Sequence, residues 1–119
     1  MPEVTRDSIR AFKGHPLKPV EVPEWGGTVY IRVMPGTERD SFEAETYKLN
    51  GKSVELNRAN FRARLLVRTL TDKDGRPLYH ISDADELGQQ PADILDKLAT
   101  VASQANGMSP KDVEDLAKN

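Results

Sequence analysis

The 119-residue sequence contains no cysteine and no long apolar run. Without thiols, the chain cannot form a disulfide, use a cysteine nucleophile or build a cysteine-based zinc site. The longest aliphatic run is Leu65-Leu66-Val67, whereas a helix that crosses a bilayer needs about 20 apolar residues. The first residues also lack the apolar core of a signal peptide. We therefore expect no disulfide and no membrane contact, and the default location is the cytoplasm.

Histidine is scarce too, since His15 and His80 are the only two. Both are predicted to lie in loops, and neither has a second ligand four residues away, which excludes a zinc site on a helix. The sequence has no glycine-rich phosphate loop and no serine in a nucleophile elbow. The acidic run 83–86 could bind a metal, but it equally suits a helix N-terminus, where carboxylates are stabilising. These absences predict a protein that is not an enzyme and has no cofactor.

Charge is unevenly distributed along the chain. Residues 1–71 have a net charge of +3 and residues 72–119 a net charge of −5, which together give −2. Either the basic and the acidic part of the chain simply form two solvated faces, or their opposite charges favour head-to-tail contacts with a partner or between copies of the chain. A homo-oligomer is therefore one of the expectations.

Two segments near the N-terminus predict a β-hairpin. Residues 18–22 and 28–33 have strand-like composition, and the second segment has β-branched residues at every other position. The intervening PEWGG indicates a loop longer than two residues. Pro19 cannot donate a ladder hydrogen bond, so the first strand should lie at a sheet edge.

A helix is predicted over 38–49. Thr37 is its expected N-cap, and Asn50-Gly51 is its expected end. Phe42 and Leu49 should lie on its buried side.

A second helix is predicted from about residue 57 or 60 to Thr71. On a helical wheel, one stripe has the width of a usual core face, and it consists of Ala59, Ala63, Leu66, Val67 and Leu70. Phe61 and Leu65 lie on nearly the opposite side. Four arginines flank that second patch: Arg58, Arg62, Arg64 and Arg68. A helix with two apolar faces is either sandwiched within the fold or presents one face to a partner.

The rest of the chain predicts further helices. A short helix should begin at the cap Ser82, the clearest helix spans 91–106, and Ser109 should cap a last short one. The fold class is therefore α+β, a hairpin packed on a mainly helical body of four to five helices. Residues 1–17 are expected to form an arm that precedes a single domain over 18–119.

Trp25, the only tryptophan, lies in the predicted hairpin loop. Either it covers the apolar face of the hairpin, or it is an exposed anchor for a partner, because tryptophan is enriched among binding hot spots. The arginines of the second helix could also contact nucleic acid. The chain is acidic overall, however, whereas a basic face is the usual footprint of a nucleic-acid-binding protein, so nucleic acid is a disfavoured partner.

Two stretches resemble a known family: VEVPEWGGTVYIRVMPGTERDSFE, and NFRARLLVRTLTDKDGRPLYHISDADELG with the ILDKLATVASQANGMSPKDVEDLAKN that follows. They are similar to the tail assembly chaperones of long-tailed bacteriophages with lambda-like tail modules, the siphophages. The likeness extends from about Val20 to Asn119 and depends on the order and spacing of segments. Residues 1–19 match nothing in it. Members of this family are short, cysteine-poor, soluble and not enzymes.

The resemblance implies a mechanism. Such chaperones coat the long, aggregation-prone tape measure protein before the tail tube polymerises around it. A longer form, made by programmed frameshifting, recruits tail tube subunits, and codons for Ala117-Lys118-Asn119 can supply a slippery run. The chaperones act in the host bacterial cytoplasm and are absent from the mature virion. The expected contacts to the tape measure protein are Phe61, Leu65, Arg58, Arg62, Arg64, Arg68 and Trp25.

Two other functions stay open. The first is a small structural or adaptor protein of the phage head–tail junction, which would remain in the finished particle. The second is a small DNA-binding regulator that uses the arginine-rich helix and binds DNA in a salt-sensitive way.

Overall fold

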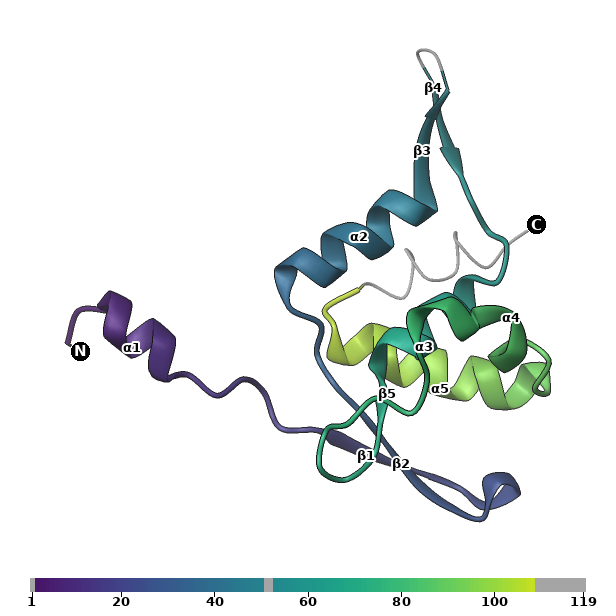
Figure 1. The fold of residues 1–119 in the computed structure, drawn as a ribbon, viewed down its shortest axis with the longest axis horizontal. Coiled ribbons are helices and arrows are strands. Elements are labelled where there is room, and N and C mark those ends of the chain that lie inside the picture. Colours follow the sequence, from purple (N-terminus) through teal and green to yellow (C-terminus); the bar gives the residue numbers. More distant parts are fainter. Residues whose placement is uncertain (1, 51–52, 109–119) are drawn as a thin grey trace.

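The computed structural model describes residues 2–50 and 53–108, with 48–50 and 53–56 described by their backbone alone. Within these residues the chain forms five α-helices and two small antiparallel sheets (Figure 1). The predicted α+β class, with a hairpin and a mainly helical body, is confirmed.

The N-terminal hairpin forms as predicted. Strand β1 (Lys18–Val22) pairs antiparallel with β2 (Gly27–Ile31), and a 3₁₀ turn over Pro23–Trp25 joins them. Gly26 ends that turn with a φ of 82°, in the left-handed region that glycine adopts without strain. A short strand, β5 (Leu70–Thr71), pairs with the other side of β2, so the sheet order is β1-β2-β5. The strand that contains the proline therefore lies at an edge, as expected.

The helix predicted to reach Leu49 ends earlier. Helix α2 spans Gly36–Thr46, and the chain then forms a second hairpin in which β3 (Tyr47–Asn50) pairs with β4 (Ser53–Leu56). The prediction was wrong because an Asn-Gly pair is a stop signal for a helix and also a strong signal for a tight hairpin turn. Tyr47 and Val54 lie three residues before and after that pair and favour strands, and Asn50 itself pairs with Ser53 as the end of β3.

The start of α2 also differs from the prediction. Its N-cap is Pro35, without a side-chain cap bond, and Thr37 lies within the first turn. Phe42 is 1% exposed, so its predicted burial is confirmed. The side chain of Leu49 and the residue Gly51 lie outside the part of the chain that the structure describes.

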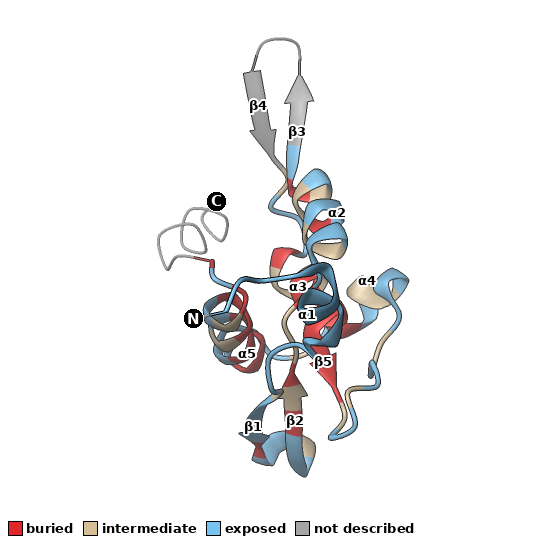
Figure 2. Ribbon diagram, turned by 90° about the vertical axis from the view of Figure 1, so that its left-hand side faces the viewer, coloured by how far each residue is buried: buried red, intermediate tan, exposed pale blue. Residues whose placement is uncertain are grey.

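Helix α3 (Phe61–Thr69) is the central helix, with contacts to α2, α4 and α5. It ends before the predicted Thr71 because Leu70 has an extended backbone and begins β5. Ala59 precedes the helix in an exposed turn, so its predicted place in the core is wrong. Figure 2 shows α3 coloured largely as buried. The rest of the predicted core stripe is buried: Ala63, Leu66, Val67 and Leu70.

The predicted long helix near the C-terminus is confirmed as α5 (Ala92–Ala105). Before it, a 3₁₀ turn over Ile81–Asp83 leads into α4 (Ala84–Leu87). The expected cap, Ser82, lies inside the 3₁₀ turn. The residue that caps the turn is His80, whose Nδ1 accepts the Ser82 backbone N–H at 3.1 Å.

A buried asparagine joins the end of α5 to the sheet. Asn106 Oδ1 accepts the Met34 backbone N–H at 2.7 Å, and its Nδ2 donates to the carbonyls of Arg32 and Ala102. These bonds hold the segment after β2 against α5. The last helix, predicted from Ser109, lies outside the described residues.

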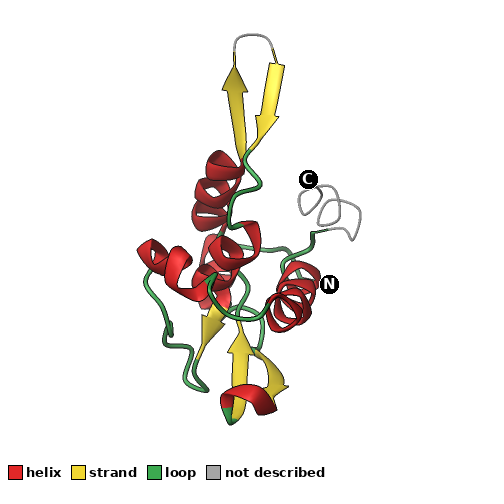
Figure 3. Cartoon of the chain, turned by 90° about the vertical axis from the view of Figure 1, so that its right-hand side faces the viewer, coloured by secondary structure: helices red, strands yellow, loops and turns green. Residues whose placement is uncertain are grey.

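Two parts project from this body: helix α1 (Arg6–Ala11), as Figure 1 shows, and the β3–β4 hairpin, as Figures 1 and 3 show. Thr5 and Ser8 cap α1 reciprocally, but no residue of α1 is buried. The Cα radius of gyration is 15.8 Å, above the roughly 13.5 Å of a compact chain of this length. The division into an arm (1–17) and a domain (18–119) stays a proposal, and the exposure of α1 supports it.

Candidate partner-binding surface

Phe61 and Leu65, expected to form an apolar surface, are 3% and 0% exposed. The ring of Phe61 lies 5.6 Å from the ring of Phe42 on α2, measured between centroids. A helix with two apolar faces was expected either to be sandwiched within the fold or to present one face to a partner. In the structure the helix is sandwiched within the fold. The expectation of an exposed patch at these two residues is wrong, because a helical wheel shows which faces are apolar but not which elements cover them.

Two of the flanking arginines share one glutamate. The side chains of Arg64 and Arg68 are only 12% and 5% exposed. Arg68 Nη2 donates to Glu45 Oε1 at 2.5 Å, and Arg64 Nη1 lies 3.7 Å from Glu45 Oε2. Arg64 also donates to Thr46 Oγ1 and to the Asn57 carbonyl. Burial lowers the pKa of Arg64 from its ordinary value, and Glu45 opposes that effect. These arginines therefore connect α3 to the end of α2.

The other two arginines lie nearer the surface. Arg62 forms an ion pair with Asp96 on α5, and Arg58 is exposed in the segment before α3. Both line a pocket of about 190 Å³ that also includes Gly88 and Gln90. This arginine pocket is polar, and its unpaired cation among the described residues is Arg58, which suits a carboxylate.

A larger groove lies between the tip of the first hairpin and the segment before α4. Its volume is about 390 Å³. Trp25, half-buried, donates its Nε1–H to Gln90 Oε1 at 3.0 Å, which fixes the indole as one wall. We call this the Trp25 groove. Because Gln90 lines the arginine pocket as well, the two hollows adjoin. The groove is lined by Trp25, Val29, Leu70, Leu78, Tyr79 and Gln90.

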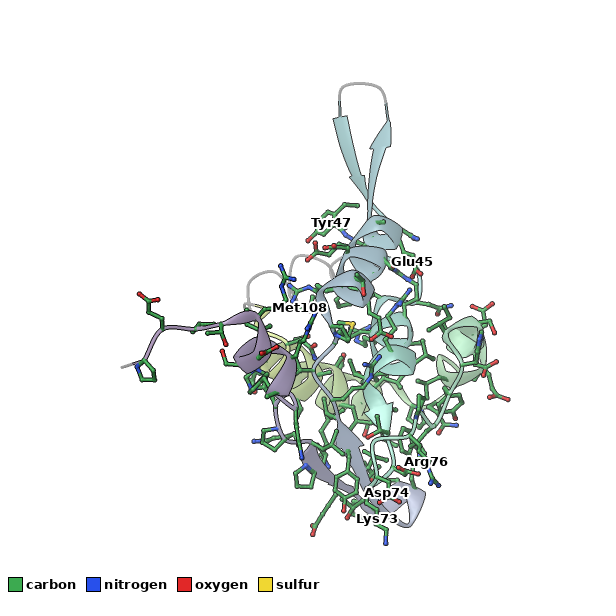
Figure 4. All side chains as sticks on the ribbon, turned by 60° about the vertical axis from the view of Figure 1, so that its left-hand side comes forward. Glu45, Tyr47, Lys73, Asp74, Arg76 and Met108 are labelled. Atoms are coloured by element: carbon green, nitrogen blue, oxygen red, sulfur yellow. The ribbon has the colours of Figure 1, made fainter. Side chains whose placement is uncertain are left out.

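A tight turn positions the second wall of the Trp25 groove. Asp72 Oδ1 accepts the backbone N–H groups of Asp74 and Arg76, and these bonds lower the pKa of Asp72, with the Arg76 N–H as the largest cause. The chain then returns along β5, and the Leu78 N–H donates to the Leu70 carbonyl at 3.1 Å. Figure 4 shows the turn at the opposite end of the molecule from Glu45 and Tyr47.

The Trp25 groove suits apolar side chains. Binding pockets are typically hydrophobic and aromatic, with a few polar groups that fix orientation. Leu78 is 48% exposed at the groove, so a partner could cover it. Within residues 2–50 and 53–108, no cluster of three or more His, Cys, Asp or Glu side chains could hold a metal. No helix in those ranges is long and apolar enough to span a bilayer.

A comparison with known protein families shows to which family the chain belongs. The sequence matches the family described as phage tail assembly chaperone over residues 6–119, nearly the whole chain. The chain belongs to the phage tail assembly chaperone family. The family expected from the resemblance is thus confirmed, and the chain has a role in tail assembly. No curated protein and no solved structure matches it.

The match also includes the arm of this chaperone. It begins at residue 6, the first residue of α1, whereas the resemblance seen in the sequence began only near Val20. Residues 6–17 of the arm therefore belong to the region that the family shares.

Sequence reasoning missed most of the Trp25 groove in this chaperone. Trp25 was the one expected contact that lies there; it packs against the core and also lines the groove, and its role as a partner contact stays a prediction. Leu78, Tyr79 and Gln90 gave no signal, because only the pairing of β5 with β2 brings them near the hairpin tip.

Proposed function

We propose that this chaperone binds the phage tape measure protein through the Trp25 groove and keeps it soluble until the tail tube forms around it. The observation that carries the proposal is the groove itself, an aromatic-walled apolar surface that includes a half-exposed leucine. A tape measure protein is a long helical chain, and its exposed apolar faces aggregate unless they are covered. An amphipathic helix that places its apolar side in a groove is a common mode of recognition.

The arginine pocket adds polarity to this surface. Arg58 is exposed in the pocket that adjoins the groove, so an acidic residue on the bound helix would pair with it, whereas Arg62 is already paired with Asp96. The matching partner segment is therefore an amphipathic helix whose apolar side is bordered by carboxylates. Such pairing at a rim contributes more to specificity and association rate than to affinity.

The remaining steps of the proposal are those that the resemblance implies. A longer form made by programmed frameshifting recruits tail tube subunits, and the chaperone leaves before the particle is complete. It acts in the host bacterial cytoplasm without catalysing a reaction. Mass spectrometry of purified virions tests this account against the alternative of a head–tail adaptor. We expect no peptides of the chain in the particle, whereas an adaptor would be present in fixed copy number.

A DNA-binding role for the arginine-rich helix has less support. Arg64 and Arg68 are largely buried and form ion pairs with Glu45, and Arg62 is paired with Asp96. Three of the four expected cations are thus already engaged within the chain.

Co-expression with the tape measure protein, followed by capture on a tag, tests the binding proposal. Leu78→Asp places a carboxylate in the groove, and Ala44→Asp, on the exposed side of α2, adds the same charge elsewhere. We expect the first variant to lose capture at least tenfold and the second to retain it. Circular dichroism melts establish that both variants fold. Equal capture by the two variants would show that the groove is not the binding surface.

A further inference from the structure

Gln90 borders both hollows of the candidate surface, the Trp25 groove and the arginine pocket. It lies between α4 and α5, where its backbone N–H donates to the Leu87 carbonyl at 3.1 Å, and it is half-buried. Because one residue belongs to both linings, a group that binds to it from the arginine pocket can affect the wall of the groove.

The indole of Trp25 determines how the Gln90 amide is oriented. An indole nitrogen can only donate a hydrogen bond, so its partner at 3.0 Å has to be the amide oxygen, Oε1. The amide nitrogen, Nε2, carries two N–H donors, and no residue that the structure describes accepts from it. What Gln90 offers to a ligand is therefore chiefly a pair of donors.

The arginine pocket adds a cation to those donors. Arg58 is exposed and has no ion-pair partner within residues 2–50 and 53–108, whereas Arg62 is paired with Asp96. Buried Phe61 and Leu95 contribute to the lining, and such apolar walls lower the local dielectric constant, which strengthens a nearby hydrogen bond. The pocket volume of about 190 Å³ is below the roughly 300–1,000 Å³ that holds a whole small ligand. The pocket therefore suits the end of one side chain.

We propose that Gln90 and Arg58 together bind one carboxylate of the partner, and that Gln90 makes this surface select an acidic side chain over the corresponding amide. One carboxylate oxygen accepts from Gln90 Nε2 and the other from the Arg58 guanidinium. A carboxylate has acceptors only, whereas a side-chain amide would bring its own NH₂ group against these donors. The proposal rests on the proposed function, because it names the group of the tape measure helix that occupies the arginine pocket.

The same amide connects the carboxylate to the wall of the Trp25 groove. When Nε2 donates to a carboxylate, negative charge increases on Oε1, and Oε1 then accepts more strongly from the Trp25 Nε1–H. An acidic side chain in the pocket therefore holds the indole more firmly, and an apolar side chain of the same helix packs against that indole. The two hollows together favour a helix that presents both kinds of side chain.

The replacement Gln90→Glu separates binding of the carboxylate from support of Trp25. Glutamate keeps an oxygen for the indole N–H, but it replaces the Nε2 donors by a second acceptor, which repels a carboxylate. Gln89→Glu is the matched control, because Gln89 is the exposed neighbour and lines neither hollow. In co-expression capture of the tape measure protein, we expect Gln90→Glu to lower capture by about tenfold or more, since a hydrogen bond to a charged group is lost. Gln89→Glu should retain capture, and circular dichroism melts establish that both variants fold.

Arg58→Gln tests whether the two residues bind the same carboxylate. It should lower capture by itself, and it should have a smaller effect in a chain that already carries Gln90→Glu, because residues that share one partner are not additive. Two fully independent effects would contradict a shared carboxylate.

A titration of the purified chain tests the site without the tape measure protein. The probe is N-acetylglutamate methylamide, and N-acetylglutamine methylamide is its matched control. NMR follows the signals of the Gln90 side-chain amide and of the Trp25 indole N–H. We expect both signals to shift in a saturable way with the glutamate probe, but not with the glutamine probe and not in Arg58→Gln. Equal shifts with the two probes, or none with either, would overturn the proposal.

The variants also distinguish this proposal from the proposed function. If Leu78→Asp abolishes capture while Gln90→Glu behaves like Gln89→Glu, only the carboxylate site is lost. If the glutamate probe shifts the Gln90 signals while Leu78→Asp leaves capture unchanged, the groove is lost as the binding surface and the carboxylate site stands.

Discussion

The replacement Glu45→Gln tests how the ends of α2 and α3 are held together. Glu45 is the ion-pair partner of Arg68, whose side chain is 5% exposed, and it also lies 3.7 Å from Arg64. Glutamine keeps the size of the side chain but removes its charge. Arg64 retains the carbonyls of Ala59 and Asn57 as acceptors, so the main effect falls on Arg68.

The structure sets the expected magnitude. Removing one partner of a fully buried ion pair costs about 3–5 kcal/mol, because the other charge stays buried and unpaired. The Glu45 side chain is 43% exposed, so solvent already weakens the pair, and we expect a loss of about 2–3 kcal/mol in the free energy of unfolding. For a chain of this length, that loss lowers Tm by about 8–15 °C.

The matched control is Glu43→Gln on the same helix. Glu43 pairs with Arg39 at 2.9 Å, and the two side chains are 45% and 30% exposed. A surface pair four residues apart on a helix contributes only about 0.3–0.5 kcal/mol. Urea unfolding, followed by the fluorescence of Trp25 and by circular dichroism, measures both variants. Equal losses for Glu43→Gln and Glu45→Gln would refute the reasoning, because they would show that Arg68 is solvated.

Two further predictions concern the core and the turn. Leu65→Ala should lower the free energy of unfolding by about 2–5 kcal/mol, whereas Leu78→Ala at the surface should change it by less than about 0.5 kcal/mol. Similar values in urea unfolding would contradict the burial of Leu65. Backbone N–H groups lower the pKa of Asp72 in the folded state. The ionised Asp72 therefore stabilises the fold at pH values above its unfolded pKa of about 3.9. This stabilisation is lost as pH falls through the lower pKa of the folded state. The difference in Tm between the wild type and Asp72→Asn should therefore shrink between about pH 5 and pH 2, and a difference independent of pH would contradict it.

The elements that the sequence predicted well are those with local signals. The first hairpin has a period of two, a glycine that suits its left-handed turn and a proline that excludes a central strand, and the structure has all three. Helix α5 has an apolar stripe over its whole length. Each of these signals lies within a few residues of the element that it defines, so no knowledge of distant contacts is needed.

The errors occurred where two structures share one signal or where a distant element decides. Asn50-Gly51 suits a helix end and a hairpin equally, and the strand-forming residues around it favour the hairpin, in which Asn50 pairs with Ser53. Phe61 and Leu65 looked like a second face because nothing in their own helix shows that α2 packs on it. The Trp25 groove combines residues 25 and 78, which become neighbours only through the sheet.

The central claim is that this chaperone covers apolar surface on the tape measure protein, and the soluble fraction of that protein tests the claim most directly. The tape measure protein is expressed alone, with the wild-type chain, with Ala44→Asp and with Leu78→Asp, and each lysate is separated by centrifugation. The account predicts a soluble tape measure protein with the wild type and with Ala44→Asp, and a pelleted one when it is alone or with Leu78→Asp. A soluble fraction that is the same with and without the chaperone would contradict the account.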